Sequence, residues 1–239
     1  MTSDTDLTSY DSIDVDTYLA HIERPNSWNN LYERPYLISR FPSLKNKNVL
    51  DIGCSSGFYT EYALENGAHV TAVDISKKMI ERLTSRVKSP KLSLHCADIS
   101  QPMPFLETES FDITICSLVL HYIKDWDILF EELYRIIKPG GKVIISAHHP
   151  FAIYLYLKPK SYYEFKLVED TWAVHSGNPF KVRYYMRPLG KILQPLLKSR
   201  FKIKSIEEML PAEGLKEKHP ELYQRLIERP GFLYIELER

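Results

Sequence analysis

Residues 53–57, Gly-Cys-Ser-Ser-Gly, match the pattern G-x-S-x-G and offer two kinds of chemistry. In α/β hydrolases this pattern presents its serine as a nucleophile on a sharp turn between a strand and a helix. A glycine loop between a strand and a helix also brings backbone close to a nucleotide-type cofactor, and then no side chain attacks. The two interpretations predict different enzymes, so the residues around the loop must decide between them.

The position of the loop in the chain disfavours a hydrolase. A hydrolase elbow follows a central strand, after earlier strands have built the sheet and an oxyanion loop. Here the loop follows the first predicted strand, Asn48–Ile52, and residues 1–47 contain neither a strand candidate nor an HGGG-like loop. Asp98 and three histidines follow in the chain order of a triad, so order alone does not exclude one. We interpret Ser55 as a small residue that lets backbone approach a ligand.

Two carboxylates accompany the glycine loop. Asp51 lies just before the loop, and Asp74 ends the second predicted strand 23 positions later. An acid at the end of the second strand is typical of a site that binds ribose hydroxyls. The carboxylate of Asp51 would repel a pyrophosphate but attract an ammonium or sulfonium group. This favours S-adenosylmethionine over NAD, whose fold also requires G-x-G-x-x-G.

Short apolar runs alternate with helical segments through the first 150 residues. Apolar spacing within residues 124–137 predicts a helix that ends before Pro139-Gly140-Gly141. Such alternation implies right-handed crossovers and a Rossmann-like, doubly wound, mostly parallel α/β sheet. The predicted strands of this part are Asn48–Ile52, His69–Asp74, Leu92–Cys96, Phe111–Cys116 and Lys142–Ser146.

The rest of the chain completes a seven-stranded sheet after an insertion. Residues 150–187 are too long for a plain connection and contain two alternating segments typical of antiparallel strands. We interpret them as a lid over the acceptor site, with a surface hairpin or a dimer contact as alternatives. Residues 188–239 predict two helices and two strands, with an antiparallel last strand. The resulting division is an N-terminal helical cap segment, a cofactor-binding core, an inserted lid and a C-terminal completion of the sheet, at 1–44, 45–149, 150–187 and 188–239.

Composition bounds the class of protein. The chain has 239 residues with 31 Lys plus Arg and 31 Asp plus Glu, so no overall field attracts nucleic acid or an anionic membrane. No apolar run reaches the roughly 18 residues of a membrane span, and the acidic N-terminus is unlike a signal peptide. The isolated cysteines (Cys54, Cys96 and Cys116) argue against zinc and disulfides. We expect a cytoplasmic monomer or homodimer without a metal, a nucleic-acid partner or stable membrane insertion.

The segment VLDIGCSSGFYTEYALENGAHVTAVDIS, residues 49–76, resembles the first two motifs of the class I S-adenosylmethionine-dependent methyltransferases. CADIS at 96–100 resembles their third motif, and FDITICSLVLHYIKDWDILFEELYRIIKPGGKVIIS at 111–146 resembles their fourth to sixth. The chain is most similar to the small-molecule group that includes the quinone-biosynthesis enzymes. The family loop usually reads D-x-G-C-G-x-G, so Ser55 replaces its middle glycine. A serine fits there if φ stays negative, and we expect altered loop detail rather than loss of binding.

The resemblance implies a site for S-adenosylmethionine beside a small-molecule methyl acceptor. In this family's arrangement, Asp51 would lie near the methionine amino group and Asp74 would hold the ribose hydroxyls. From the N-terminal segment, Tyr32 or Arg34 would contact the methionine carboxylate. An NAD-dependent oxidoreductase and a non-catalytic S-adenosylmethionine-binding regulator remain as alternatives. The resemblance implies further cofactor contacts at Gly53, Ser55, Gly57, Ile75, Asp98, Ile99 and Ser117.

Three histidines are candidates for a general base. Methyl transfer requires an acceptor aligned with the S–CH3 bond and the exclusion of water. A base helps when the acceptor is a hydroxyl or an acidic carbon. His121 follows the predicted fourth strand, and His148 and His149 follow the fifth. We name His121 and His149 as candidate catalytic residues because of their location and accessible pKa, although each is also compatible with a structural histidine.

Overall fold

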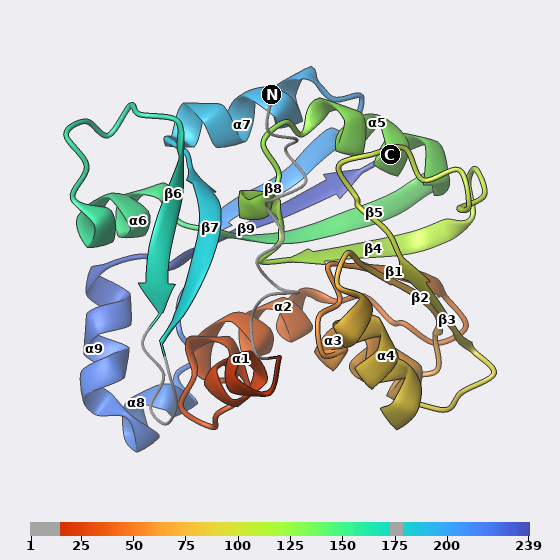
Figure 1. Ribbon diagram of the computed structural model, residues 1–239, viewed down its shortest axis with the longest axis horizontal. Helices are drawn as coiled ribbons and strands as arrows, with labels where there is room; N and C mark the ends of the chain where they lie inside the picture. Colours follow the sequence, from red (N-terminus) through yellow and green to blue (C-terminus); the bar gives the residue numbers. More distant parts are fainter. Residues whose placement is uncertain (1–14, 173–178) are drawn as a thin grey trace.

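The computed structural model describes residues 15–172 and 179–239 (Figure 1). The start of the predicted cap segment and residues 173–178 of the predicted lid lie outside this part of the chain. Within the described ranges, seven strands form one sheet in the order β3-β2-β1-β4-β5-β9-β8. These strands are β1 (Asn48–Ile52), β2 (His69–Asp74), β3 (Leu92–Cys96), β4 (Phe111–Ser117), β5 (Ile137–His148), β8 (Lys202–Glu208) and β9 (Phe232–Glu238).

The direction of the strands confirms the predicted fold class. Strands β1 to β5 pair in parallel, whereas β9 runs antiparallel to both β5 and β8. The order of connection reverses between β1 and β4, which are neighbours in the sheet. In open α/β sheets, ligands bind outside the carboxyl ends of the strands at such a switch point. The sheet thus places a crevice where β1, β2 and β4 end.

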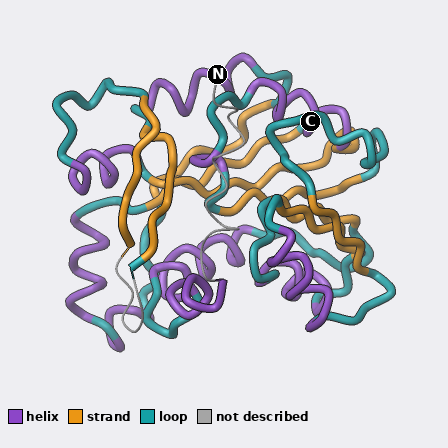
Figure 2. The backbone as a smooth tube through the Cα atoms, in the orientation of Figure 1, coloured by secondary structure: helices purple, strands orange, loops and turns teal. Residues whose placement is uncertain are grey.

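Helices cover both faces of the sheet (Figure 2). One face carries α5 and α7, and the other carries α2, α3, α8 and α9 (Figure 1). The longer helical segments are α1 (Val15–Ile22), α2 (Arg34–Arg40), α3 (Phe58–Glu65), α4 (Lys77–Arg86), α5 (Asp127–Ile136), α6 (Pro150–Leu157), α7 (Leu189–Lys198), α8 (Gly214–Lys218) and α9 (Pro220–Glu228). Two further helical segments are the π-helical η3 (Asn29–Glu33), which leads into α2, and the 3-10 helical η4 (Leu120–Tyr122), which lies between β4 and α5.

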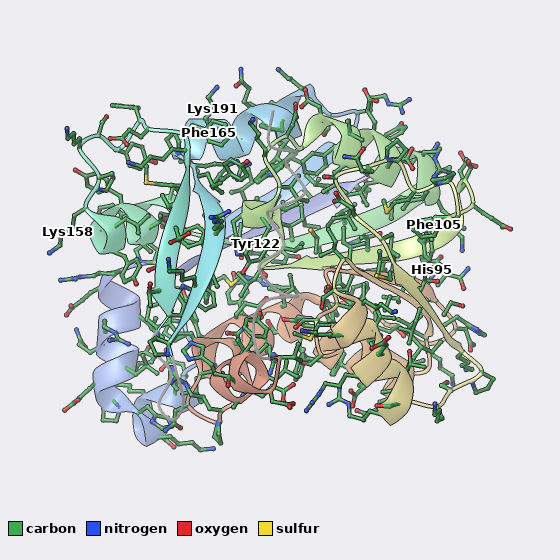
Figure 3. The ribbon with its side chains drawn as sticks, in the orientation of Figure 1. His95, Phe105, Tyr122, Lys158, Phe165 and Lys191 are labelled. Atoms are coloured by element: carbon green, nitrogen blue, oxygen red, sulfur yellow. The ribbon has the colours of Figure 1, made fainter. Side chains whose placement is uncertain are left out.

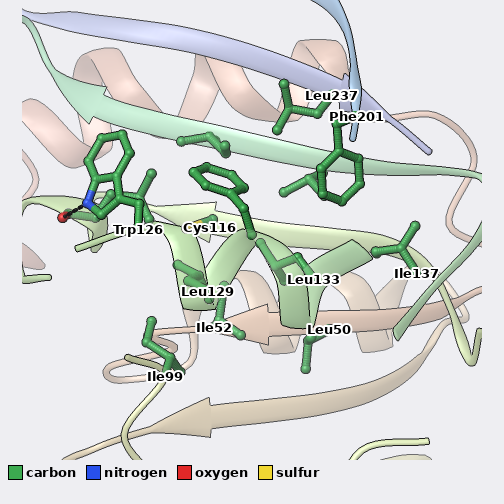
Figure 4. Close-up of a cluster of buried hydrophobic side chains, with 14 of the residues drawn as sticks. Leu50, Ile52, Ile99, Cys116, Trp126, Leu129, Leu133, Ile137, Phe201 and Leu237 are labelled. Atoms are coloured by element: carbon green, nitrogen blue, oxygen red, sulfur yellow. Dashed lines mark hydrogen bonds between the residues drawn. The ribbon is translucent and has the colours of Figure 1, made fainter. Parts of the chain in front are cut away.

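The pleat of β1 divides its side chains between the two layers. Leu50 and Ile52 are fully buried in the cluster that includes Leu129 and Leu133 of α5 (Figure 4). Val49 is buried in the opposite cluster, against α3. Because alternate residues of a strand point to opposite faces, Asp51 shares the α3 side with Val49. The apolar packing of β1 therefore fixes which layer the carboxylate of Asp51 faces.

The inserted region forms a small unit of its own. Helix α6 leads to strands β6 (Lys166–Trp172) and β7 (Phe180–Met186), which pair as the predicted antiparallel hairpin. Ile153, Leu157 and Val182 from this unit pack in one cluster with Tyr18 and Ile22 of α1. The region therefore lies against α1 (Figure 1). Helix α6 was not predicted, because the sequence FAIYLYL at 151–157 has no polar positions to mark a helical period.

Candidate active site

A cavity of about 630 Å³ lies at the carboxyl ends of β1, β2 and β4. A volume of this order is typical of sites that enclose a small organic ligand. Each of these three strands contributes a polar side chain at its end: Asp51, Asp74 and Ser117. The predicted site residues in the cavity wall are Asp51, Gly53, Ser55, Asp74, Ile75, Asp98, Ile99 and Ser117. The switch point thus brings together most of the predicted cofactor set.

Two glycines of the loop are required by geometry. Gly53 has φ +70°, and a Cβ there would lie 2.5 Å from Cγ2 of Val119. Gly57 has φ +92°, and its Cβ would lie 2.4 Å from Cδ1 of Leu83. Both positions therefore combine a left-handed backbone with close packing. Gly57 is not in the cavity wall: it precedes α3 and allows that helix to approach α4.

Ser55 also lies in the left-handed region, with φ +48°. The condition under which we expected a serine to fit, a negative φ, is therefore not met. Its hydroxyl is buried, without a hydrogen-bond partner among the described residues. No described histidine contacts that hydroxyl, so the geometry of a nucleophile elbow is missing from this part of the chain. The backbone N–H of Ser55 donates to Oδ2 of Asp74 at 2.8 Å, which holds the strained loop in place.

Asp74 has a structural function in addition to its place in the wall. Its second oxygen, Oδ1, accepts from the backbone N–H of Ser76 at 2.9 Å. Ser76 in turn caps α4 by accepting from the N–H of Met79 at 3.4 Å. One carboxylate therefore joins the glycine loop to the start of α4 while lining the cavity. Asp74 can therefore stabilise the loop and the start of α4 and still accept hydrogen bonds from a ribose.

Asp51, which is 2% exposed, provides the second carboxylate of the cavity wall. The hydroxyl of Thr60 donates to its Oδ2 at 2.7 Å. Burial raises the pKa of Asp51 to about 7, and the nearby charge of Asp74 adds to the rise, although the Thr60 bond opposes it. A buried carboxyl of this kind gains a partner when a cation enters the cavity. This is the chemistry that an ammonium group requires.

Asp98, Ile75 and Ile99 form the far side of the same wall. Oδ1 of Asp98 accepts from the N–H of Ser100 at 2.9 Å, which leaves its other oxygen outside that turn. The side chain of Ile75 is 37% exposed, although it is apolar and lines the cavity. The two isoleucines supply apolar surface for a flat base, beside a carboxylate that accepts hydrogen bonds. These residues fit an adenine group.

In the N-terminal segment, the structure brings Arg34 rather than Tyr32 to the cavity. The hydroxyl of Tyr32 donates to the carbonyl of Met209, and its ring packs 5.3 Å from that of Phe232. The guanidinium of Arg34 lies 3.9 Å from the centre of the Phe58 ring, and both residues line the wall. Burial lowers the pKa of Arg34. Its largely buried positive charge suits an anionic group of a ligand.

Glu33 supports the site from behind the cavity wall, and the sequence analysis did not identify it. It is fully buried and accepts three hydroxyl hydrogen bonds, from Tyr59 at 2.8 Å, Ser117 at 2.8 Å and Ser146 at 2.6 Å. Burial raises the pKa of Glu33, while these donors oppose the rise. A glutamate in a polar segment gives no signal by itself. The sequence feature that could have indicated a buried acceptor is the pair of serines, Ser117 and Ser146, near the ends of two adjacent strands.

The predicted catalytic histidines lie away from the main cavity. The ring of His121 stacks on that of His148 at 4.2 Å, and the two line a separate cavity of about 20 Å³ with Arg187. Burial lowers the pKa of His121 well below its usual value and that of His148 to about 4. His149 accepts from the N–H of Phe151 at 3.2 Å and so caps α6. The structure brings neither His121 nor His149 to the wall.

The remaining wall of the main cavity comes from outside the glycine-loop motifs. Tyr18 and Ile22 project from α1, and Tyr122 follows His121 on η4, near the centre of the molecule (Figure 3). Within residues 15–172 and 179–239, no group of three His, Cys, Asp or Glu side chains could hold a metal ion. No helix in the same ranges is long and apolar enough to cross a membrane.

The fold and the site define an α/β protein that binds a nucleoside-containing cofactor at its switch point. A family model described as a methyltransferase domain matches residues 50–145. An uncharacterized protein of Haemophilus influenzae is 27% identical over 236 residues, which cover 90% of each chain. The ubiquinone biosynthesis O-methyltransferase of Coxiella burnetii is 33% identical over 129 residues, 53% of this chain and 54% of that protein. This match therefore spans about half of the length of that relative.

A solved structure extends the similarity to most of the chain. The S-adenosylmethionine-dependent methyltransferase from Mesorhizobium loti has a TM-score of 0.71 and 26% identity, covering 87% of this chain and 97% of that one. Residues 50–145 of the chain thus match a methyltransferase domain. Together with this structural similarity, the match supports an S-adenosylmethionine-dependent methyltransferase whose cofactor is S-adenosylmethionine. The chain is similar in sequence to the quinone-biosynthesis group of that family.

Replacing Ser55 with glycine should stabilise the protein. The left-handed backbone is strained for serine and unstrained for glycine, and the change removes a buried hydroxyl without a partner. We expect Ser55→Gly to raise the free energy of unfolding by about 1 kcal/mol and to keep the affinity for S-adenosylhomocysteine within severalfold. The neighbouring Ser56→Gly is the control in denaturant unfolding and should destabilise. A destabilised Ser55→Gly variant would contradict the strain argument.

Removal of the Glu33 carboxyl should have the opposite effect. Glu33→Ala leaves three hydroxyl groups without their acceptor in a closed space. We expect the free energy of unfolding to fall by about 2–4 kcal/mol. Glu65→Ala is the control, because Glu65 is exposed on α3 and its loss should change stability by less than about 0.5 kcal/mol. Similar urea midpoints for the two variants would show that the buried contacts of Glu33 are not stabilising.

Proposed function

We propose that the protein transfers the methyl group of S-adenosylmethionine to an oxygen of a small, largely apolar acceptor. The observation that carries this proposal is the continuity of the main cavity, which extends from the carboxylates of Asp51 and Asp74 to a wall formed by Tyr18, Ile22 and Tyr122. The printed name of the Coxiella burnetii relative, an O-methyltransferase of ubiquinone biosynthesis, supports an oxygen acceptor.

In the proposed arrangement, the charged groups of the wall orient the cofactor. Asp51 binds the ammonium of its methionine moiety, and Arg34 binds the carboxylate. Asp74 accepts hydrogen bonds from the ribose hydroxyls, in addition to those from the loop and α4. Asp98 accepts a hydrogen bond from the adenine amino group between Ile75 and Ile99. When bound, the cofactor supplies a methyl group that its sulfonium has already activated.

The other half of the cavity aligns the acceptor and excludes water. Tyr18, Ile22 and Tyr122 present aromatic and apolar surface there. None of the described residues that line the cavity is a histidine. We therefore propose that the acceptor oxygen is acidic, as in a phenol or a carboxylic acid, so that alignment and desolvation carry most of the catalysis. His121 and His149 have no direct contact with the acceptor in this proposal.

Methyl transfer from labelled cofactor tests this function. The purified protein is incubated with labelled S-adenosylmethionine and a panel of phenols, carboxylic acids, amines and thiols. Label should pass to phenols or carboxylic acids. The Asp51→Asn variant should transfer label to the same acceptors at a reduced rate. Tight binding of S-adenosylhomocysteine with no transfer to any class would favour the regulatory alternative. Transfer to amines alone would contradict an oxygen acceptor.

Cofactor affinity should depend on pH through Asp51. The carboxyl has a pKa of about 7 in the cofactor-free protein, so it is mainly protonated below that pH. Because the ammonium group requires the ionised form, the affinity for S-adenosylhomocysteine should fall about tenfold per pH unit as pH drops below 7. The fall should end at the lower pKa that Asp51 has beside a bound cation.

Calorimetry across this pH range measures the effect, in buffers of different ionisation enthalpy. Binding near neutral pH should release protons, since Asp51 loses its proton when the ammonium enters. Asp51→Asn should bind more weakly and without this pH dependence. An equally steep pH profile in Asp51→Asn would assign the titration to another group.

A further inference from the structure

Helix α6 exposes apolar side chains to an unusual extent. Of its eight residues, Pro150 is buried, Phe151 and Tyr156 are exposed, and the other five are half-buried, although all seven after Pro150 are Phe, Ala, Ile, Tyr or Leu. A helix on the surface of a globular protein normally turns a polar face outward. Contiguous exposed apolar surface of this kind marks an interaction site.

The exposed apolar side chains continue beyond α6. They extend through its connection to β6 and reach the start of α7, as the positions of Phe165 and Lys191 in Figure 3 show. Tyr163 is 83% exposed and Tyr156 is 60% exposed. We call this set the α6 surface: its exposed apolar residues are Phe151, Tyr156, Tyr163, Phe165, Leu167 and Leu189.

Lysines surround these aromatic residues. Lys158 and Lys160 follow α6, and Lys191 lies on α7 (Figure 3). All three are exposed, and none forms an ion pair with a carboxylate in the described part of the chain. The nearby acids are engaged: Glu164 pairs with Lys166, Glu169 pairs with Lys181, and Asp170 accepts a hydrogen bond from the hydroxyl of Tyr156 at 3.1 Å. The α6 surface is therefore both apolar and positively charged.

The charge asymmetry extends along the sequence. Residues 138–206 contain thirteen lysines and arginines but three acidic residues, in a chain whose total charge is zero. Part of this excess is neutralised from outside the range, because Lys138, Lys142 and Lys204 pair with Asp112, Glu236 and Glu238. Lys158, Lys160 and Lys191 of the α6 surface have no such ion pair in the described part of the chain. A local concentration of positive charge attracts an anionic surface even when the net charge is zero.

We propose that the α6 surface binds the interface of an anionic lipid membrane. Aromatic side chains favour the level of the lipid headgroups, and lysines on the same face bind anionic headgroups. The protein would lie on the membrane rather than span it, in line with the lack of a spanning helix in the described ranges. A second copy of the chain is a poorer occupant, because its α6 surface carries the same excess of unpaired lysines.

The inner side of α6 connects this surface with the main cavity. Ile153 and Leu157 belong to the same cluster as Tyr18, Ile22 and Tyr122, which line the cavity. The membrane-binding helix is therefore one layer of side chains from the proposed acceptor wall. Entry of an apolar acceptor from the membrane would follow if the proposed function holds. The binding of the surface to lipid does not depend on that function.

Vesicle flotation with the full chain tests the surface. Vesicles of phosphatidylcholine containing phosphatidylglycerol should bind the protein, and vesicles of phosphatidylcholine alone should bind it weakly. Added salt should weaken the binding, because the lysines are exposed. Lys158→Gln with Lys160→Gln should weaken it about 25-fold, since each lysine near an anionic membrane contributes about a factor of five. Tyr156→Ser with Tyr163→Ser should also weaken it tenfold or more.

The matched control is Lys216→Gln with Lys218→Gln on α8, which also removes two exposed lysines. Its vesicle binding should stay within twofold of the original protein. Melting temperature and affinity for S-adenosylhomocysteine should be unchanged in both lysine pairs, which shows that each variant folds. An equal loss in the control, equal binding to neutral vesicles, or dimerisation through the α6 surface without vesicle binding would each overturn the proposal.

Discussion

The buried carboxyl of Glu33 determines how the N-terminal segment joins the sheet. Removing a carboxyl from water costs several kcal/mol unless its oxygens are hydrogen-bonded. Hydroxyls from α3, β4 and β5 meet this requirement through Tyr59, Ser117 and Ser146. Arg34 is the next residue, and its guanidinium lies in the cavity wall, where it donates to Oδ1 of Asn30 and packs over the Phe58 ring. The backbone that carries this cavity-lining charge is thus anchored by a carboxyl that does not itself line the cavity.

The loop after β1 depends in a similar way on Asp74. Three of its residues, Gly53, Ser55 and Gly57, have positive φ, so the loop is not a conformation that the chain adopts easily. The bond from the Ser55 N–H to Asp74 offsets part of that strain. Binding and loop geometry therefore share one side chain. Loss of Asp74 would remove a carboxylate from the cavity wall and also release the loop that shapes the cavity.

Much of the fold and of the cofactor site could be predicted because both follow from strand positions. Asp51 and Asp74 end parallel strands, and the carboxyl ends of neighbouring parallel strands share one edge of the sheet. The sequence could not place side chains in segments where a small rotation of the backbone decides whether a side chain points into the cavity. Tyr32 and Arg34 are two positions apart at the end of η3, and only Arg34 lines the cavity. His149 turns into the N-terminus of α6, because Pro150 starts that helix.

The proposed acceptor wall depends on contacts that join distant parts of the sequence. Arg187, which follows β7, donates to the carbonyls of Ile123 and Lys124, and its guanidinium lies 4.8 Å from the centre of the Trp126 ring. The inserted region therefore holds the segment after η4, which lines the cavity together with α1. Residues 50–145 contain the glycine loop and its acids, whereas α1 and the insertion lie outside that match. The proposed acceptor wall thus combines η4, which lies inside the matched domain, with α1, which lies outside it.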